Sequence, residues 1–329
     1  MMKIKLFAMY LVLSCMVTIG QVRFDAVHSV QVKSSWKELT DTAEIEVPKN
    51  LKFKNKNVRD YIKTGDPVTI KLGYNENLKR EFVGFVREIE GNLPIKVLCE
   101  DYSYILKRKN FNQSFQNATL KDVVSYISSE FDFATDVVDI QLGKFAMEQA
   151  NGAKVLEQIR SSYGLVSYFK HNPDDDSKPV LHVGFPYAFD GTAQDVRFRV
   201  QSNILSHDLK YKSPEDNTVK IKAISNLRSG QKKVIEVGDE GGSVETRNYP
   251  ELSEDELRKY ANEELRKAKL EGYRGSITAF GIPRVEHGDT VILEDTEYPD
   301  RQGSYLVDAT NQKFSEGGYR RDIEIGQKV

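Results

Sequence analysis

Residues 64–106 read TGDPVTIKLGYNENLKREFVGFVREIEGNLPIKVLCEDYSYIL, and the interpretation of the whole chain depends on them. The segment begins with the turn signal Gly65-Asp66-Pro67, because glycine tolerates positive φ and proline presets φ at a turn corner. Apolar and polar residues then alternate over 68–72, which predicts a half-buried strand. The polar stretch 73–77 predicts a chain reversal.

A second strand is predicted over 82–89. Gly84 inside it indicates a bulge or a close approach of two backbones. A third run, over 95–99, closes this meander at Asp101.

The same order of signals returns near the C-terminus. His287-Gly288-Asp289 repeats the Gly-Asp turn, and the run that it opens continues to Leu293. Strands are then predicted over 304–307 and 319–325. A period this long is not typical of a solenoid. It predicts two related β-modules in one chain.

Composition describes an ordinary soluble protein. The 329 residues predict two or three domains, and 39% hydrophobic with 29% charged residues excludes a disordered chain. A net charge of −2 lacks the strongly basic footprint of a duplex-binding protein. Cys15 and Cys99 have no metal-site spacing, so we expect two buried, reduced thiols.

The N-terminus has two interpretations. Residues 1–13 have the charged and apolar regions of a signal peptide, and Cys15 follows a sequence that resembles a lipoprotein cleavage box. The apolar character continues through 16–24, which instead predicts a strand hairpin. The run is too short for a confident membrane-spanning helix. We favour the strands, and an exported surface lipoprotein that binds glycans or protein partners stays as the alternative.

The next segment is strand-like from 17 to 47. His28 in it is expected on a strand surface or at an interface, because no second ligand lies at metal spacing. A basic run at 49–56 predicts a solvated face, with contact to a polyanion or an acidic partner as the alternative.

The pattern changes after Leu106. Thr119 can cap a helix whose apolar residues have helical spacing, and a second helix ends at Gly164. Strands are predicted over 165–169 and 180–187. Residues 107–200 therefore read as a small α/β module inserted between the β-modules, which span 1–106 and 201–329. The last module contains the longest predicted helix, which begins with a capping box at Ser253.

The chain carries no recognised catalytic signature: no nucleophile elbow, zinc-protease helix, phosphate loop or dinucleotide fingerprint is present. The acidic run at 174–176 lacks calcium-loop spacing, and the glycines at 238–242 lack the lysine of a phosphate loop. A hydrolase with an unrecognised carboxylate pair stays open, but no pair stands out. We predict no enzyme and no catalytic, cofactor or metal residue.

Several segments resemble one protein family when they are taken in order. They are Asp41 to Pro48, Gly65 to Tyr74, Phe82 to Phe85, Cys99 to Asp101, Phe280 to Pro283, His287 to Asp289, Gly303 to Asp308 and Gly318 to Arg321. The chain resembles, over nearly its whole length, the phage tail baseplate hub proteins. These are the late-control-protein-D and Mu-like tail hub proteins, relatives of the N-terminal part of type VI secretion spike proteins.

The resemblance implies a mixed, mainly β fold: two related β-barrel modules (1–106 and 201–329) with an inserted small α/β module (107–200). It implies a homotrimer that joins a sixfold tail tube protein to a threefold central spike protein. DNA or cargo would pass through the ring lumen without sequence recognition. The expected location is a virion tail assembled in the bacterial cytoplasm, or a related contractile injection machine, without membrane anchoring. Because the sequence stops at Val329, we expect the spike and any peptidoglycan-cutting activity on separate chains.

The residues singled out are structural. The glycines among them are expected where a side chain would strain a turn or block packing, and Asp66 and Asp289 are expected to bond the backbone of their own turns. The full set of turn and packing positions is Gly65, Asp66, Gly73, Gly84, Asp101, Gly281, Pro283, Gly288, Asp289, Gly303, Asp308 and Gly318.

Overall fold

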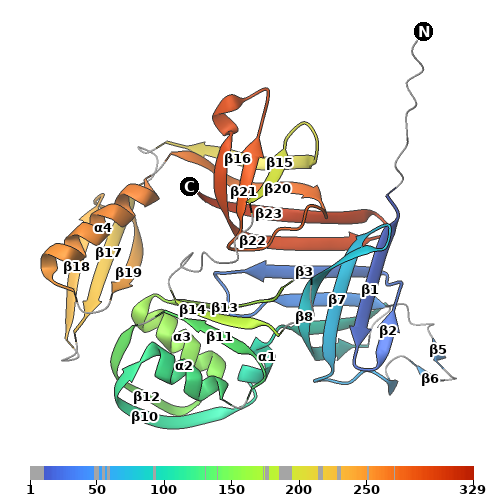
Figure 1. The fold of residues 1–329 in the computed structure, drawn as a ribbon, viewed down its shortest axis with the longest axis horizontal. Helices are drawn as coiled ribbons and strands as arrows, with labels where there is room; N and C mark the ends of the chain where they lie inside the picture. The colour runs from blue at the N-terminus through green and yellow to red at the C-terminus, as the bar shows by residue number, and fades with distance from the viewer. Residues whose placement is uncertain are drawn as a thin grey trace.

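The computed structural model describes residues 11–47, 52–53, 56–57, 60–91, 94–129, 131–138, 140–172, 174, 178–184, 195–213, 218–227, 231–249, 252–269 and 271–329. Several sequence predictions fall outside these residues: the first ten residues of the leader interpretation, most of the basic run at 49–56, the end of the acidic run at 175–176 and the end of the strand predicted over 180–187. The structure is mainly β, as predicted. Thirteen of the described strands belong to one sheet, which crosses the middle of Figure 1.

Five strands of the first module lie in this sheet in the order β3-β4-β9-β8-β7. Their bounds are β3 (Ser29–Ser35), β4 (Thr42–Val47), β7 (Pro67–Tyr74), β8 (Asn77–Glu90) and β9 (Ile95–Glu100). Alternation of buried and half-buried residues along β4 matches its sequence pattern, because successive side chains of a strand point to opposite faces. The buried face contributes to one hydrophobic core.

The second module repeats this pairing order. Its strands run β16-β20-β23-β22, with β21 on the far side of β22. They are β16 (Ile204–Lys212), β20 (Gly272–Phe280), β21 (Thr290–Glu294), β22 (Gly303–Ser315) and β23 (Gly318–Lys328). The strand that follows each Gly-Asp turn (β7 or β21) therefore pairs with the next strand, which pairs in turn with the last one.

The two modules share one sheet because β22 is long enough to pair with two strands in succession. Its first part, from Gly303 to Leu306, pairs with β21, and its second part, from Ala309 to Ser315, pairs with β3. Strand β23 lies on its other side. In Figure 1 the red strand β22 lies directly beside the blue strand β3, with β23 on the other side of β22.

The expected pair of β-barrel modules is not confirmed by this arrangement. No closed barrel is detected among the described residues: eleven of the thirteen strands form an open path from β16 to β2, and the other two, β21 and β15, branch from β22. Alternation identifies the faces of a strand but not its neighbours, so the sequence could not show that β22 leaves its own module to pair with β3.

Three further strands complete the sheet. The predicted N-terminal hairpin is present as β1 (Leu13–Ile19) and β2 (Val22–Phe24), and β1 pairs with β7. In the second module β15 (Asp195–Arg199) pairs with β21 in parallel. Away from the sheet are the short pair β5 (Lys52–Phe53) and β6 (Lys56–Asn57), and the 3₁₀ turn η3 (Pro299–Arg301).

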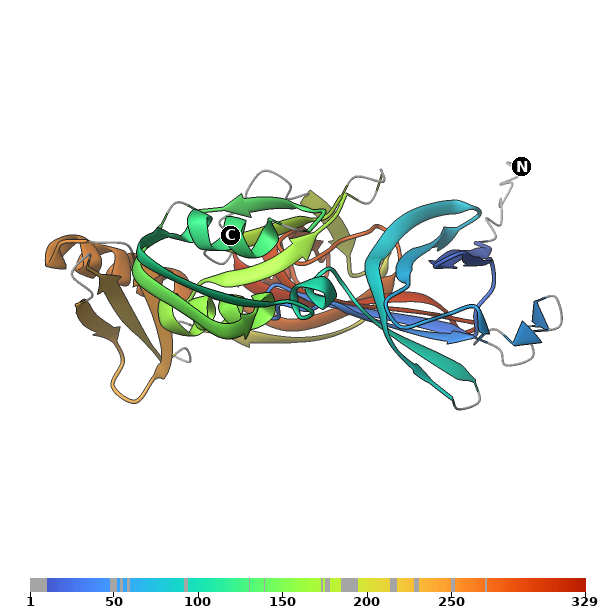
Figure 2. The same ribbon diagram turned by 90° about the horizontal axis from the view of Figure 1, so that it is seen from below.

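The inserted unit has its own core, beneath the sheet in Figure 1 and in front of it in Figure 2. Helix α2 begins after Thr119, whose side chain forms a capping box with Asp122, and α3 ends at Gly164 with φ 67°. Both ends match the sequence prediction. The elements are α1 (Ser103–Leu106), β10 (Asn110–Thr119), α2 (Leu120–Ser128), β11 (Ala134–Val137), β12 (Gln141–Asn151), α3 (Gly152–Tyr163), β13 (Val166–Lys170) and β14 (Val180–Gly184).

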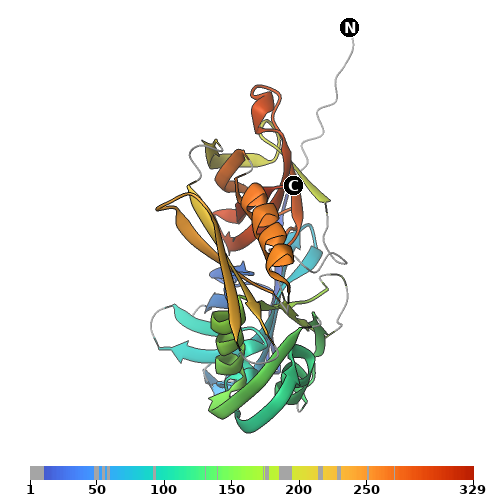
Figure 3. The same ribbon diagram turned by 90° about the vertical axis from the view of Figure 1, so that its left-hand side faces the viewer.

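A second small unit lies within the range assigned to the C-terminal module. Helix α4 (Glu254–Ala268) packs on the sheet of β17 (Val219–Asn226), β18 (Lys232–Gly238) and β19 (Ser243–Tyr249). Their shared core is separate from the others, with Leu257 and Ala261 of the helix fully buried against Ile221 and Ala223. Figure 3 shows this orange unit in front of the red module and the green inserted unit.

Gly84 lies where β8 passes over the end of β9. A Cβ built on it would lie 2.1 Å from the carbonyl oxygen of Glu100 and 2.8 Å from the Cα of Asp101. Both are backbone atoms, so neither can rotate away. The glycine thus allows a close approach of two strands, while the register with β7 stays regular at this position.

We expect Gly84→Ala to lower the free energy of unfolding by about 2 kcal/mol, because an inserted methyl group must displace backbone. The matched control is Gly317→Ala, whose added Cβ would meet only the Ser315 hydroxyl at 3.5 Å. Urea unfolding followed by tryptophan fluorescence or circular dichroism measures both. Equal stability of the two variants would contradict the steric explanation.

Candidate functional site

The two Gly-Asp turns are hydrogen-bonded alike. In the first, the Asp66 carboxylate accepts from the Lys63 amide at 2.7 Å, and in the second the Asp289 carboxylate accepts from the Glu286 amide at 2.9 Å. Gly65 and Gly288 have φ of 90° and 81°, which favours glycine. The carboxylate thus stabilises a turn whose shape the glycine permits.

The same pair of backbone hydrogen bonds joins each turn to a later strand of its module, β8 in the first and β22 in the second. Gly65 N–H donates to the Val86 carbonyl, and Val86 N–H donates to the Asp66 carbonyl. In the second turn, Gly288 N–H donates to the Val307 carbonyl, and Val307 N–H donates to the Asp289 carbonyl. The two turns therefore share their hydrogen bonds as well as the Gly-Asp sequence, which indicates a repeated structural unit.

A register shift follows this pair of hydrogen bonds in both modules. The pairing of β8 with β9 shifts between Val86 and Glu88, and that of β22 with β23 shifts between Val307 and Ala309. A shift of this kind bends a strand and increases its twist. In the second module it coincides with the point where β22 leaves β21 and begins to pair with β3.

Asp308 occupies that second shift and contacts the first module. Its carboxylate accepts from the indole Nε1 of Trp36 at 3.0 Å and pairs with Lys37 Nζ at 2.8 Å. Its carbonyl accepts from the Ser35 hydroxyl at 3.2 Å. The residue therefore ties β22 to the end of β3, where the two modules meet.

A fully buried arginine joins the modules at their centre. Arg321 of β23 has no exposed surface, and its Nη2 lies 2.8 Å from Oε1 of Glu81 in β8, whose side chain is 2% exposed. Its other bonds go to the carbonyls of Gly281 and Val285 and to the Tyr319 hydroxyl. A buried charge is tolerated when it is paired and its donors are satisfied.

The tyrosine next to this pair reinforces it. Tyr319 donates its hydroxyl proton to Glu81 Oε1 at 2.8 Å. Burial and the Glu81 carboxylate raise the pKa of Tyr319 well above its ordinary value, so the hydroxyl stays protonated. Its backbone carbonyl accepts from the Tyr74 hydroxyl at 2.9 Å, which adds another link to β7.

A chain of charges continues from Glu81 to the inserted unit. Arg284 lies 3.7 Å from Glu81 and donates to Glu286 at 2.7 Å. Lys170, the last residue of β13, lies 3.5 Å from Glu286 and 3.4 Å from Asp289. The second Gly-Asp turn therefore holds a lysine of the inserted unit between two carboxylates.

Burial and the neighbouring charges shift the pKa values of the carboxylates in this charged series. Burial raises the pKa of Glu286, but the positive charges of Arg284 and Lys170 outweigh it and hold the pKa below its ordinary value. Burial raises the pKa of Asp289 despite the nearby Lys170. We call this buried set (Glu81, Arg284, Glu286, Asp289, Lys170, Tyr319 and Arg321) the ionic junction.

Two histidines border the ionic junction, the buried His287 and the half-buried His171. His287 stacks edge-on against Tyr168, with ring centroids 4.8 Å apart, and its Nε2 lies 3.9 Å from Asp41. Burial lowers the pKa of His287 to about 3, and burial lowers the pKa of His171 to about 4. His171 contacts the Arg80 carbonyl at 3.3 Å. Both imidazoles are therefore neutral at pH 7.

Asp101 is placed at the start of the inserted unit. Its carboxylate accepts from the Ser103 amide at 2.9 Å and from the Asp41 amide at 3.2 Å. Burial raises the pKa of Asp101 to about 6, and burial together with the Asp101 charge raises the pKa of Asp41. This aspartate thus connects the entry of the inserted unit with the first module.

The remaining sequence-predicted positions lie in close contacts. A Cβ on Gly73 would lie 1.9 Å from the Asn77 carbonyl oxygen, and one on Gly281 would lie 2.1 Å from the Tyr319 ring. Gly303 and Gly318 have φ of 155° and 124° and lie beside lysine and arginine side chains. Pro283 follows a cis peptide bond. The second-module members of the set thus surround the ionic junction or the β22–β23 hairpin.

Sequence reasoning missed most of the ionic junction. Glu81, Arg284 and Lys170 were assigned no role, and Arg321 appeared only within the Gly318 motif. Only the structure shows why Glu81 is buried: it falls at a register shift of β8 against β7, and Arg80, Glu81 and Phe82 are buried in succession. Such a run breaks the period of two and indicates a bulge.

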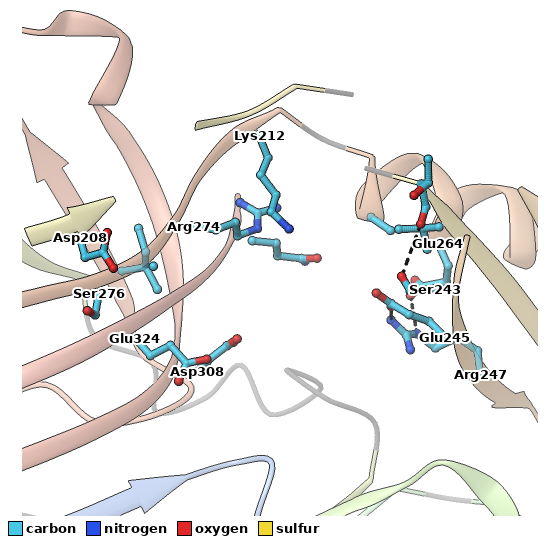
Figure 4. Close-up of a pocket in the computed structure, with 16 residues that line it drawn as sticks. Asp208, Lys212, Ser243, Glu245, Arg247, Glu264, Arg274, Ser276, Asp308 and Glu324 are labelled. Atoms are coloured by element: carbon cyan, nitrogen blue, oxygen red, sulfur yellow. Dashed lines mark hydrogen bonds and ion pairs between the residues drawn. The ribbon is translucent and has the colours of Figure 1, made fainter. Parts of the chain in front are cut away.

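A cleft lies between the second module and the unit of α4. It measures about 740 Å³. Figure 4 shows Lys212 and Arg274 on one side of it and Glu245, Arg247 and Glu264 on the other. Arg247 already pairs with both of these glutamates. Because both signs of charge line the cleft, we assign it no ligand.

Other site classes receive no support within the described part of the chain. No cluster of three or more His, Cys, Asp or Glu side chains there could hold a metal ion. Cys15 and Cys99 are both free and buried, as expected, and burial raises the pKa of Cys99 to about 12. No helix among these residues has the length and apolar character needed to cross a membrane.

We expect Glu81→Gln to lower the free energy of unfolding by about 3 kcal/mol, because Arg321 is left buried without its counter-charge. The control is Asp25→Asn, which breaks the exposed pair with Arg23 and should cost less than about 1 kcal/mol. Urea unfolding of both variants gives the comparison. Similar small losses would contradict a stabilising role for the ionic junction.

The buried His287 predicts a loss of stability in acid. A folded-state pKa of about 3 for His287, below the ordinary 6.5, means that the unfolded chain binds the proton more tightly. The contribution of the neutral His287 to the free energy of unfolding is complete above pH 7 and is lost as the pH falls from about 6.5 toward 3. Between pH 7 and pH 5 this loss amounts to about 2 kcal/mol.

The contribution of His287 is isolated by measuring the free energy of unfolding of the native chain and of His287→Gln at pH 7 and pH 5. The native chain should lose about 2 kcal/mol more than the variant over the interval. The raised pKa of Asp101 acts in the opposite direction in both proteins and cancels in the difference. Parallel pH profiles would show that His287 does not titrate as its burial predicts.

Comparison with known proteins was made by sequence and by structure. The sequence matches no protein-family model and none of the curated proteins. The structure resembles a 43 kDa tail protein of prophage MuSo2 from Shewanella oneidensis, with a TM-score of 0.63 and 13% identity over 95% of this chain and 98% of that one. It also resembles the tail protein from Neisseria meningitidis MC58, with a TM-score of 0.64 and 14% identity over 96% and 97% of the two chains.

A third similar structure comes from a secretion machine. An E. coli component of the type VI secretion system matches with a TM-score of 0.61 and 10% identity, over 95% of this chain and 77% of that one. That protein is described as structurally similar to the T4 bacteriophage tail proteins gp27 and gp5. The resemblance predicted from the sequence is thus confirmed: over nearly its whole length, the chain has the fold of phage tail proteins and of a type VI secretion component.

Proposed function

We propose that the protein is the structural baseplate hub of a phage tail or a related contractile injection machine. Three copies would form a ring that joins a sixfold tail tube protein to a threefold central spike protein. The observation that carries this proposal is the repeat: two modules with the same strand order and the same hydrogen-bonded Gly-Asp turn lie in one chain.

The repeat matters because of symmetry. A trimer of chains with two similar modules presents six similar surfaces around one axis while it keeps only threefold symmetry. One face of such a ring can meet six tube subunits, and the other can meet three spike chains. The fold shared with phage tail proteins supports placing the chain in this setting.

The ionic junction suits this role. An adaptor transmits load between tube and spike, so its modules must keep a fixed relative orientation. A buried ion pair whose partners come from different modules penalises their separation, because each charge would be left without its partner. Continuous pairing of β22 with β3 adds a row of backbone bonds across the same boundary.

The proposal assigns no catalysis to the chain. DNA or cargo would pass through the ring lumen without sequence recognition, and the chain's near-neutral net charge of −2 is compatible with passage without tight binding. The protein would be part of the virion tail, assembled in the bacterial cytoplasm without membrane anchoring. The chemistry of the site supports a mechanical function, because its charged groups are buried and paired with one another.

Native mass spectrometry of the full chain tests the oligomer. We expect a complex of three intact chains of 37.5 kDa each, either alone or on addition of the tube or spike partner. A stable dimer or tetramer would contradict the ring. A monomer trimmed to Cys15 with added lipid mass would instead support the exported lipoprotein.

A further inference from the structure

Strand β10 of the inserted unit is an edge strand without a charged residue. It reads NFNQSFQNAT over ten residues, and its only neighbour among the described strands is β12. In a chain with 29% charged residues, a run of this length would ordinarily include about three charges. In Figure 1 the strand follows the lower rim of the molecule.

Every other edge strand that the structure describes carries at least one charged residue. Charges on an edge discourage pairing with other chains, and natural proteins use them, with bulges and proline, to protect such strands. The charged edge strands are β2, β5, β6, β11, β12, β13, β15, β16, β18 and β19. β10 is the exception within the described residues.

The polar side chains of β10 face solvent, while its apolar ones bind the strand to the inserted unit. Phe111 and Ala118 are buried, and Phe111 and Phe115 both contact the ring of Tyr126 in α2. The exposed positions are Asn110, Asn112, Gln113, Ser114, Gln116 and Asn117. None of these amide and hydroxyl groups is needed for the core.

The centre of β10 has a regular geometry. Its register with β12 shifts between Phe111 and Gln113 and again between Phe115 and Ala118, so bulges lie toward both ends. Between them, residues 113–115 pair in step with β12. A straight section with one unpaired edge can accept a further strand through backbone hydrogen bonds.

The charges around the strand indicate what kind of segment would pair with it. Arg108, exposed just before β10, donates to the Tyr104 hydroxyl and has no ion-pair partner among the described residues. Lys121 is exposed just after the strand. An incoming segment therefore meets an uncharged edge flanked by cations, which favours carboxylates at its ends.

We propose that the β10 edge binds an extended segment of a different protein that adds as an antiparallel strand, is uncharged where it pairs with β10 and places a carboxylate at its C-terminal end beside Arg108. This would give the proposed hub a lateral attachment point separate from the junction of its two modules. It rests on the hub function only for the setting in which the partner occurs. The surface itself is argued from the strand.

Hydrogen–deuterium exchange of the full-length protein tests the proposal locally. The probes are two amidated synthetic peptides at millimolar concentration, TVNTVTDD and the matched TVNTVTKK. In antiparallel pairing the C-terminal end of either peptide meets Arg108. We expect TVNTVTDD to slow amide exchange in residues 110–119 several-fold and TVNTVTKK to have a much smaller effect.

Two variants complete the design. Asn112→Lys with Ser114→Lys puts charges on exposed positions of the edge and should abolish the protection. The control, Gln158→Lys with Ser161→Lys, adds the same charges to exposed positions of α3 and should leave it unchanged. Protection that persists in the first variant, protection elsewhere in the chain, or none at all would overturn the proposal.

Native mass spectrometry of the same variants separates this proposal from the hub function. An unchanged oligomer is expected for Asn112→Lys with Ser114→Lys, because the edge is assigned to a different protein. A changed oligomeric state would assign the edge to a second copy of this chain and overturn the proposed partner. Absence of a trimer of the native chain, both alone and with the tube or spike partner added, would contradict the hub while leaving the exchange result intact.

Discussion

The ion pair between Glu81 and Arg321 is the constraint on which the rest of the structure depends. Removing two charges from water is costly, and the cost is offset only when each charge finds the other and its remaining hydrogen bonds are made. Arg321 meets this condition through Glu81, Tyr319 and two backbone carbonyls. Since Glu81 and Arg321 belong to different modules, the pair can form only when the modules are docked correctly.

The ionic junction also explains why the inserted unit has a defined position. Its Lys170 lies between Glu286 and Asp289, and Asp101, just before its helix α1, accepts a hydrogen bond from the backbone of Asp41. Asp289 has a second function, because its other oxygen holds the Gly-Asp turn of the second module. One turn therefore shapes its own module and fixes its neighbour, and a change there would affect both.

Much of the local structure could be predicted from the sequence. The Gly-Asp turns, the strands after them and the caps at Thr119 and Gly164 follow from short-range chemistry, so a few neighbouring residues determine them. The shared sheet could not be predicted, because alternation does not identify a strand's partners. The ionic junction was hidden for the same reason: Arg321 lies in an alternating strand, and the carboxylate that allows its burial is 240 positions away.

The central claim is that two equivalent modules in each of three chains make a ring with six similar surfaces. Electron cryomicroscopy of the purified oligomer tests it most directly. The account predicts a threefold map in which the turns at Gly65 and Gly288 alternate around the axis at similar radius and height, six in all. A map with twofold symmetry, or one with the two kinds of turn at clearly different radii, would contradict it.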